Sequence, residues 1–444
     1  MHSWQKVSWL ALLMFAAVAA RSDVADSWKP TEAAAAKASK AAQFAEAERL
    51  LKSNLKLAQT FGPKDPRRPR TLFDLAEVDR AEGKYNDALP LYEQALQIYT
   101  SLYGKDATEI ADVQNGEAEL YKSLNDYAHA EPLLVNALAL RQKLLKEGDP
   151  DIAQGENDLG ELYTATGAFD KAEPLLLQAM ASRQKTPGQQ SAEVAQSLQA
   201  LGALYSKTGR AKQAEESYRE AVSIFGKTIG GNHPDYASAL ENLALSYAAR
   251  GDFANAEPLL ERVLEIRRTV FGPEHRDVAA SLDNLAAMKR SQHQPEEAAA
   301  LYEQAIAIWE KVLGPDSPDL APDLNNLGEI YEMSKDKPRA EPLFLRAAAL
   351  DEKALGAESP ELGTDLHNLG LLYLLTKRYD EAQKVYQRAL AIRIKTLGDQ
   401  DPAVAQTMSS YAVVLHNLHR EQEALALEKR AQSIQAGQNR MRSQ

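Results

Sequence analysis

The sequence has 444 residues, of which 44% are hydrophobic and 26% are charged, so the chain can bury a core and is not disordered by composition. Its 51 Lys and Arg residues stand against 63 Asp and Glu residues, and the resulting net charge of −12 argues against nucleic acid as the main partner, since nucleic acid needs a concentrated basic face. The absence of cysteine excludes disulfide scaffolds, Cys-ligated zinc, iron–sulfur clusters and thiol nucleophiles.

The N-terminal segment differs in composition from the rest of the chain. Val7 to Ala20 is an uncharged apolar run, and Ala17-Val18-Ala19 matches the small-x-small pattern of a signal-peptidase site. The run is shorter than the roughly 20 residues that span a bilayer. We therefore predict a signal peptide at residues 1–20 and export to the periplasm or the exterior. The alternatives are an N-terminal membrane anchor or a cytoplasmic protein. No second apolar stretch could hold the mature chain in a membrane.

A repeat of 42 residues organises the remainder. Residues 21–69 are predicted to form an Ala-rich helix and a partial repeat, and residues 70–405 form eight full 42-residue repeats. A partial repeat or cap follows at residues 406–437, and residues 438–444 are expected to be a disordered tail.

Four kinds of residue recur at fixed offsets in most of the repeats. The anchor is a leucine, followed at once by Gly or Ala, four residues later by an aromatic residue, and thirteen residues later by an alanine present in every repeat. The leucines are Leu75, Leu159, Leu201, Leu243, Leu285, Leu327 and Leu369. The alanines are Ala88, Ala130, Ala172, Ala214, Ala256, Ala298, Ala340, Ala382 and Ala424.

These offsets predict a pair of helices in each repeat. The leucine, the small residue and the aromatic residue share one face of a first helix, and the alanine lies on the packed face of a second. Glycines between the two patterns, such as Gly83 and Gly209, suit a tight turn with positive φ. Recurrent Glu-Pro pairs, such as Glu173-Pro174, suit the first turn of the second helix. A single hairpin cannot bury its apolar face alone, so neighbouring hairpins are expected to stack.

This pattern resembles the tetratricopeptide repeat. The longer repeat, with motifs such as Asn325-Asn326-Leu327-Gly328 and Ala340-Glu341-Pro342-Leu343, is similar to the kinesin-light-chain subtype. The resemblance implies an all-α, right-handed superhelical solenoid of stacked helical hairpins, in which the first helices line a concave groove.

The residue just before the leucine is then expected to face the groove. It is asparagine in four consecutive repeats, at Asn242, Asn284, Asn326 and Asn368. In the resembled family, asparagines at this position hydrogen-bond the backbone of an extended peptide, and an amide can both donate and accept. The preceding position is variable, and it would add specificity through Glu241, Asp283, Asn325 and His367. The alternative is that these side chains bond neighbouring helices or loops.

The charges of the expected groove give a further hint about the ligand. Glu77, Glu119 and Glu161 form an acidic N-terminal stretch that would favour a basic ligand segment. Lys and Arg are largely missing from the positions at which a carboxylate-clamp variant of the family holds a chain terminus, so we do not expect that mode of binding.

The sequence contains none of the catalytic motifs that we sought: no H-E-x-x-H, no phosphate-binding glycine loop and no G-x-S-x-G. We therefore expect a non-enzymatic scaffold with no cofactor and no metal, which binds an extended peptide of a protein partner in its groove. The alternative is a structural or assembly subunit of a cell-envelope complex that docks through its convex face or its ends.

Overall fold

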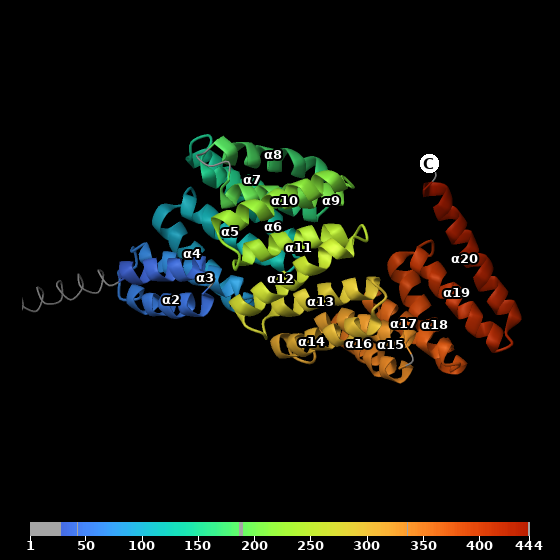
Figure 1. Ribbon diagram of the computed structural model, residues 1–444. Coiled ribbons are helices and arrows are strands. Elements are labelled where there is room, and N and C mark those ends of the chain that lie inside the picture. Colours follow the sequence, from blue (N-terminus) through green and yellow to red (C-terminus); the bar gives the residue numbers. More distant parts are fainter. Residues whose placement is uncertain (1–27, 42, 186–189, 335, 443–444) are drawn as a thin grey trace, which may run out of the picture. The chain divides into compact units, whose positions relative to one another are not determined.

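The computed structural model describes residues 28–41, 43–185, 190–334 and 336–442, and in these ranges every regular element is a helix (Figure 1). The predicted signal peptide at residues 1–20 lies outside the described residues. The helices follow in pairs joined by short turns, as the 42-residue repeat predicts. They are a helix over residues 28–40, α2 (Phe44–Ala58), α3 (Arg67–Ala81), α4 (Tyr85–Tyr103), α5 (Thr108–Ser123), α6 (Tyr127–Leu144), α7 (Pro150–Ala165), α8 (Phe169–Lys185), α9 (Ala192–Lys207), α10 (Ala211–Thr228), α11 (Pro234–Ala248), α12 (Phe253–Phe271), α13 (Arg276–Ser291), α14 (Pro295–Leu313), η1 (Pro318–Leu320), α15 (Ala321–Met333), η2 (Lys337–Arg339), α16 (Ala340–Leu355), α17 (Pro360–Leu375), α18 (Tyr379–Leu397), α19 (Pro402–Asn417) and α20 (Glu421–Arg442).

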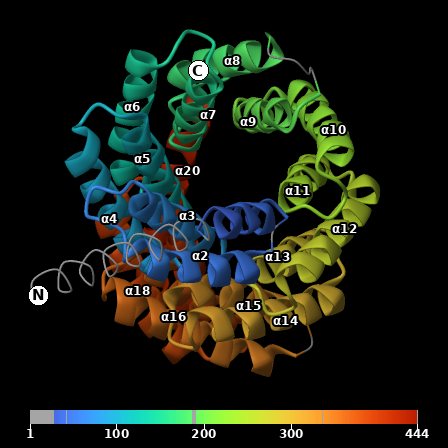
Figure 2. The same ribbon diagram turned by 90° about the vertical axis from the view of Figure 1, so that its left-hand side faces the viewer.

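The chain divides into two compact units, Met1–Asp252 and Phe253–Gln444. Within each unit, every helix contacts the next along the chain, so hairpins stack in sequence order. In the first unit, the helices from α5 to α11 succeed one another along an arc (Figure 2). The fold is an all-α repeat solenoid, which confirms the predicted fold class. Among the described residues, none of the helices is both long enough and apolar enough to span a bilayer.

Close packing inside each hairpin explains the small residue after the leucine. A Cβ added to Gly202 would lie 2.6 Å from the Tyr218 ring, and one added to Gly370 would lie 2.8 Å from the Tyr386 ring. Those rings belong to the second helix of the same hairpin, and the Tyr386 side chain is completely buried. Larger residues at these positions would force the two helices apart.

In eight of the hairpins, the turn between the two helices contains one described residue in the left-handed region. Glycine fills this position in four of the repeats, with φ between 74° and 81°, which confirms the predicted turn. Asn125, His293, Lys377 and His419 adopt φ values of 58° to 61° at the equivalent positions. For a residue with a side chain, this conformation costs roughly 1–2 kcal/mol.

Buried arginines join consecutive hairpins at a recurring position of the second helix. Arg183 donates to the Ser197 hydroxyl at 2.8 Å, and Arg393 donates to the Thr407 hydroxyl at 2.8 Å. Both arginines are less than 8% exposed, and each also donates to a backbone carbonyl at the start of the next helix. A buried guanidinium needs such partners, so these contacts fix how one hairpin packs on the next.

The N-terminal helix and α2 form a further helical pair that packs on α3. The Trp28 indole donates to the Thr71 hydroxyl at 3.2 Å, and the Asn54 amide donates to the Trp28 carbonyl at 3.0 Å. The end of the N-terminal helix also meets a distant loop of the same unit, where His233 Nε2 lies 3.2 Å from the Lys40 carbonyl oxygen. The first helical pair therefore contacts the loop before α11.

The C-terminal hairpin differs in one respect from the sequence prediction. Its second helix, α20, continues to Arg442, whereas a disordered tail was expected from residue 438. The added residues are Gln, Asn, Arg and Met, most of which have good helix propensity.

Candidate functional site

A polar cavity of about 810 Å³ lies in the first unit, where the faces of five consecutive first helices meet. The residues at its edge come from α3, α5, α7, α9 and α11, with Tyr127 and Arg141 added by α6. The charged and amide side chains that line it are Glu77, Arg80, Asp112, Asn115, Glu119, Lys122, Arg141, Gln154, Asn157, Asp158, Glu161, Gln196, Gln199, Lys207, Asp235 and Asn242. Four of them, Glu77, Glu119, Glu161 and Asn242, are residues that the repeat pattern predicted to face the groove.

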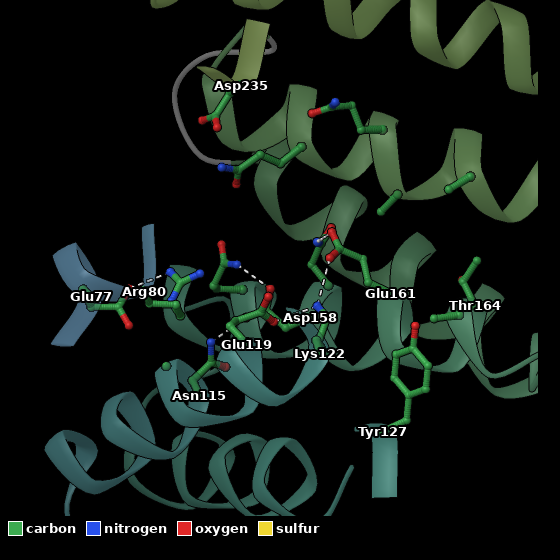
Figure 3. A pocket seen from close by; sticks show the side chains of 18 of the residues that line it. Glu77, Arg80, Asn115, Glu119, Lys122, Tyr127, Asp158, Glu161, Thr164 and Asp235 are labelled. Atoms are coloured by element: carbon green, nitrogen blue, oxygen red, sulfur yellow. Dashed lines mark hydrogen bonds and ion pairs between the residues drawn. The ribbon is translucent and has the colours of Figure 1, made fainter. Parts of the chain in front are cut away.

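A cluster of three carboxylates around one ammonium, here called the Lys122 cluster, occupies one side of the cavity (Figure 3). Lys122 Nζ lies 2.7 Å from Glu119 and 3.2 Å from Glu161. Burial, followed by the neighbouring Asp158 and Glu161 charges, raises the pKa of Glu119 to about 7, although Lys122 opposes this shift. Burial lowers the pKa of Lys122, but the carboxylates outweigh burial and raise it overall. One ammonium therefore faces three carboxyl groups, so the Lys122 cluster has more acidic groups than basic ones.

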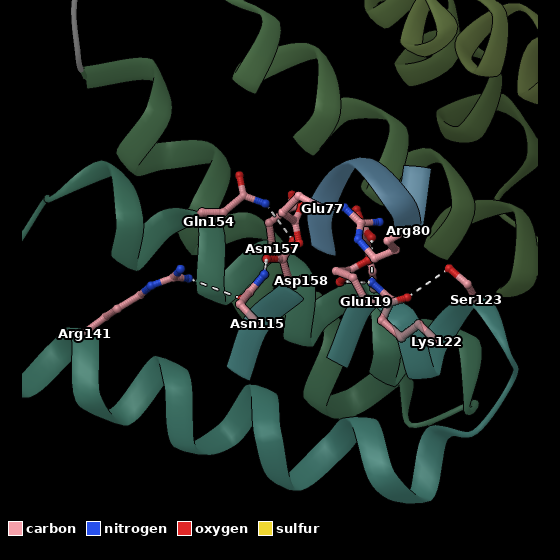
Figure 4. Close-up of polar contacts among 11 residues, drawn as sticks. Glu77, Arg80, Asn115, Glu119, Lys122, Ser123, Arg141, Gln154, Asn157 and Asp158 are labelled. Carbon is pink, nitrogen blue, oxygen red and sulfur yellow. Dashed lines mark hydrogen bonds and ion pairs between the residues drawn. The ribbon is translucent and has the colours of Figure 1, made fainter. Parts of the chain in front are cut away.

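Asp158, the third acid of the Lys122 cluster, is only 5% exposed and is held by two amides (Figure 4). The Asn115 amide donates to one carboxylate oxygen at 2.9 Å and the Gln154 amide to the other at 2.7 Å. Burial raises the pKa of Asp158 in spite of the nearby Lys122. The amides of α5 and α7 on this side of the cavity are thus already used to hold a buried acid.

Two arginines add positive charge that the sequence analysis did not place in the groove. Arg80 lies 2.8 Å from Glu77, and Arg141 lies 2.9 Å from Asp112. Arg80 follows the predicted groove residue Glu77 by three positions, as Lys122 follows Glu119, and residues three apart lie on the same face of a helix. That spacing is the signal that could have placed Arg80 and Lys122 in the groove.

The α9 and α11 side of the cavity is different, because its amides are not engaged. Gln196, Gln199 and Asn242 are half-buried, and none makes a hydrogen bond to any part of the chain that the structure describes. We call these three side chains the amide wall. Lys207, at the end of α9, is exposed and likewise forms no ion pair with the described residues.

Of the eight predicted groove residues, Asn242 lies in this cavity, and Glu241 is its half-buried neighbour on α11. The other six belong to the second unit. There the amides bond one another and their neighbours: Asn368 donates to Asn325 at 3.4 Å, and Asn325 donates to Asp365 at 2.6 Å. Asn326 accepts from Arg290 at 3.3 Å, and Asn284 is half-buried on α13.

His367 and Asp283, two of the variable positions, are tied to the core of the second unit. His367 is 4% exposed, its Nδ1 lies 3.2 Å from the Thr407 hydroxyl, and its ring meets the Tyr386 ring edge-on. Burial, with a smaller effect of Arg393, lowers its pKa to about 4. Asp283 accepts from the Trp309 indole at 2.9 Å, and burial raises its pKa to about 6. The repeat pattern predicted a groove position for His367, whereas the structure shows its ring in the core.

One group of acids could in principle hold a metal ion. Oxygens of Glu48, Asp79 and Glu82 lie within 4.8 Å of one another. The ammonium of Lys84 lies 2.7 Å from Glu48 and 2.9 Å from Glu82, so a side chain of the protein already supplies the positive charge at this place. The arrangement is that of an ion-pair network between α2 and the turn after α3.

A protein-family model matches the chain along nearly the whole repeat array, and this match identifies the family. A tetratricopeptide repeat model matches residues 33–101, 70–143, 151–227, 208–269, 235–310, 277–353 and 361–436. The chain belongs to the tetratricopeptide repeat family. This confirms the resemblance drawn from the sequence pattern, and it extends the family to the helical pair before residue 70. Proteins built from this repeat are typically scaffolds for protein–protein interaction. No curated protein matches the chain.

Solved structures share the repeat fold. A putative kinesin light chain of Podosopora anserina with nearly identical TPR-like repeats is 30% identical, with a TM-score of 0.42, and the match covers 45% of this tetratricopeptide repeat chain and 95% of that one. A Rap protein complexed with Competence and Sporulation Factor is 13% identical, with a TM-score of 0.51 and coverage of 84% and 99%. The Rap conjugation gene regulator of plasmid pLS20, in complex with the Phr* peptide, is 17% identical, with a TM-score of 0.50 and coverage of 66% and 77%.

Proposed function

We propose that this tetratricopeptide repeat protein is a non-enzymatic scaffold that binds an extended peptide segment of a partner protein in the cavity of its first unit. The observation that carries the proposal is the polar cavity of about 810 Å³ along the first helices of five consecutive repeats. A cavity of this size can enclose a short peptide segment. Within the second unit, Asn284, Asn326 and Asn368 would offer a peptide the same kind of amide contact.

The charge of the cavity supports a ligand with a basic segment. Six carboxylates line the cavity against four cationic side chains. The excess is concentrated at the Lys122 cluster, where the raised pKa of Glu119 reflects burial and, after it, the repulsion among neighbouring acids. A ligand ammonium or guanidinium placed there would neutralise that excess, and charge-assisted hydrogen bonds are among the strongest that a protein offers.

The two Rap structures support peptide binding by analogy of fold alone. One is a complex with the Phr* peptide and the other a complex with Competence and Sporulation Factor, and these ligands belong to those proteins. The shared fold raises the expectation that this solenoid also accepts a peptide, while the choice of ligand depends on its own cavity residues.

We also propose that the protein is exported, since the apolar run from Val7 to Ala20 and the small residues at its end have the pattern of a cleaved signal peptide. Cell fractionation, with sequencing of the N-terminus of the recovered protein, tests this. A new N-terminus near residue 20 in the envelope or secreted fraction is the expected result. An intact Met1 in the cytosol would refute export.

Crosslinking capture from cells tests the scaffold proposal. We would compare the wild type with Asn242→Ala and with the combined Asn284→Ala, Asn326→Ala and Asn368→Ala variant. We expect one partner to be lost or reduced with Asn242→Ala while thermal stability is unchanged. Loss only with the combined variant would move the site to the second unit. A partner retained by both variants would favour docking through the convex face or the ends instead.

A further inference from the structure

The second helix of a repeat has a recurring position, eleven residues after its alanine, that faces the first helix of the next repeat. This position is arginine in four repeats, at Arg141, Arg183, Arg267 and Arg393. The last three arginines each donate, at 2.8 or 2.9 Å, to a Ser or Thr hydroxyl fourteen residues further along the chain. A guanidinium and a hydroxyl group are therefore recurrent partners where one hairpin packs on the next.

One repeat of the second unit has an acid at each of these two places. Asp351, in the last part of α16, stands at the arginine position, and Asp365, on α17, stands at the position of the Ser or Thr. The two carboxyl groups lie within hydrogen-bond distance of each other. Asp351 is 4% exposed and Asp365 is 2% exposed. Two buried acids thus meet at the junction between the α15–α16 hairpin and the α17–α18 hairpin.

The hydrogen bonds of this acid pair leave one place for a proton. The Asn325 amide donates to Asp365 Oδ1 at 2.6 Å, whereas Asp365 Oδ2 has no donor in the part of the chain that the structure describes. An ionised carboxyl group can only accept, so a hydrogen bond between Asp351 and Asp365 requires a proton on one of them. Two buried like charges in contact are also costly. A single proton held between the two carboxyl groups removes both penalties.

The groups around the acid pair do not supply a cation. Glu361, at the start of α17, and Asp319, in η1, are the charged groups that act most strongly on the pair, and both are acids. On α18, Arg393 donates to hydroxyl groups of α17 and α19 instead. His367, two residues after Asp365, is neutral above about pH 4, because burial lowers its pKa to about 4. The surroundings therefore favour the protonated form of the pair.

Burial is the main cause that raises the pKa of Asp365 from 3.8 to about 7, and the charges of Asp351 and Glu361 raise it further, while Asn325 opposes the shift. Burial likewise raises the pKa of Asp351. The folded second unit therefore binds a proton here more tightly than the unfolded chain does. The stability that this proton contributes is fully present below about pH 3.8 and is lost as the pH rises towards 7.

We propose that Asp351 and Asp365 share one proton and make this junction of the second unit responsive to acid, so that its two hairpins pack most firmly in a mildly acidic medium. Loss of the proton leaves two buried negative charges between α16 and α17 and loosens their packing. The acid pair lies outside the cavity of the first unit, and its response does not depend on whether that cavity binds a peptide.

Hydrogen exchange of the α16 and α17 amides in the full chain tests this proposal, with protection factors corrected for intrinsic exchange rates at pH 5 and pH 8. Asp351→Asn keeps the side-chain shape and supplies a permanent donor. Asp351→Arg combined with Asp365→Ser installs the partners of the other junctions. Asp380→Asn, at an exposed position of α18, is the control. Burial also raises the pKa values of Asp323 and Glu332 to about 7, so each variant is compared with the wild type at both pH values.

We expect the wild type and the Asp380→Asn control to lose protection in α16 and α17 by about tenfold or more between pH 5 and pH 8. Asp351→Asn and the double variant should lose several-fold less. The double variant decides the matter if Asp351→Asn does not fold. A wild-type loss of protection in the variants would overturn the proposal. Wild-type protection at pH 8 that rises with added Ca²⁺ and falls with a chelator would also overturn it, because the two carboxylates would then hold a cation.

Discussion

Replacing Glu119 with glutamine tests the electrostatics of the Lys122 cluster. Burial and the neighbouring acids raise the pKa of Glu119 from 4.5 to about 7, so the folded protein binds this proton more tightly than the unfolded chain does. The free energy of unfolding should therefore fall as the pH rises from about 4.5 to 7. The substituted glutamine would keep the shape of the side chain and could still accept from Lys122, but it would not ionise.

The size of the effect follows from the change in pKa. A rise from 4.5 to about 7 corresponds to about 3 kcal/mol. The side chain is 26% exposed, so solvent screening reduces the expected gain of Glu119→Gln at pH 8 to about 1–3 kcal/mol. Near pH 4.5 both folded proteins hold a neutral group, and the difference should shrink towards zero.

Hydrogen exchange of the α5 to α7 amides at several pH values is the appropriate assay, because a solenoid opens locally and a single global transition is not assured. Glu147→Gln, in the exposed loop before α7, is the control and should change little. A Glu119→Gln variant that is less protected than the wild type at pH 8, or whose gain is the same at every pH, would refute this account of the cluster.

Three further substitutions probe the packing of the hairpins. Gly370→Ala should destabilise the second unit by about 1–3 kcal/mol, because the new methyl group would meet the Tyr386 ring, and thermal unfolding should show the loss. Gly437→Ala, with open space around it, is its control and should be neutral or slightly stabilising. Lys377→Gly should stabilise the protein by about 1 kcal/mol by relieving a φ of 61°, and an unchanged melting temperature would contradict this. Arg393→Met should cost on the order of 2 kcal/mol, since its acceptors on α19 lose their donor, and hydrogen exchange in α19 would report it.

The fold could be predicted from the sequence because each element of the repeat is local. The leucine, small residue, aromatic residue and alanine lie within one 42-residue block, and a period repeated eight times leaves one arrangement that buries every apolar face. Even the left-handed turn was predictable where glycine marks it. At Lys377 and His293 no glycine marks the turn, and only the register of the repeat places it.

The site was less predictable, because whether a groove amide is free depends on the adjacent repeat. Asn325 and Asn242 occupy neighbouring positions of the same pattern, yet Asn325 finds an aspartate 40 residues further on and Asn242 has no hydrogen bond within the described residues. The residue at the partner position varies from repeat to repeat, so the pattern gives the direction of a side chain without giving its neighbour. His367 shows the same effect, since its ring is buried against Thr407 and Tyr386.

The contact between His233 and Lys40 joins residues 193 positions apart in a fold whose other contacts are mostly between neighbouring hairpins. The curvature of a solenoid can change through small adjustments in the packing between each pair of neighbouring hairpins. The contact between the first helical pair and the loop before α11 limits such changes in curvature within the first unit. One exposed hydrogen bond contributes only about 1 kcal/mol, so this contact would break often and form again quickly. The first unit could then change its curvature by large amounts only while the contact between the His233 ring and the Lys40 carbonyl is broken.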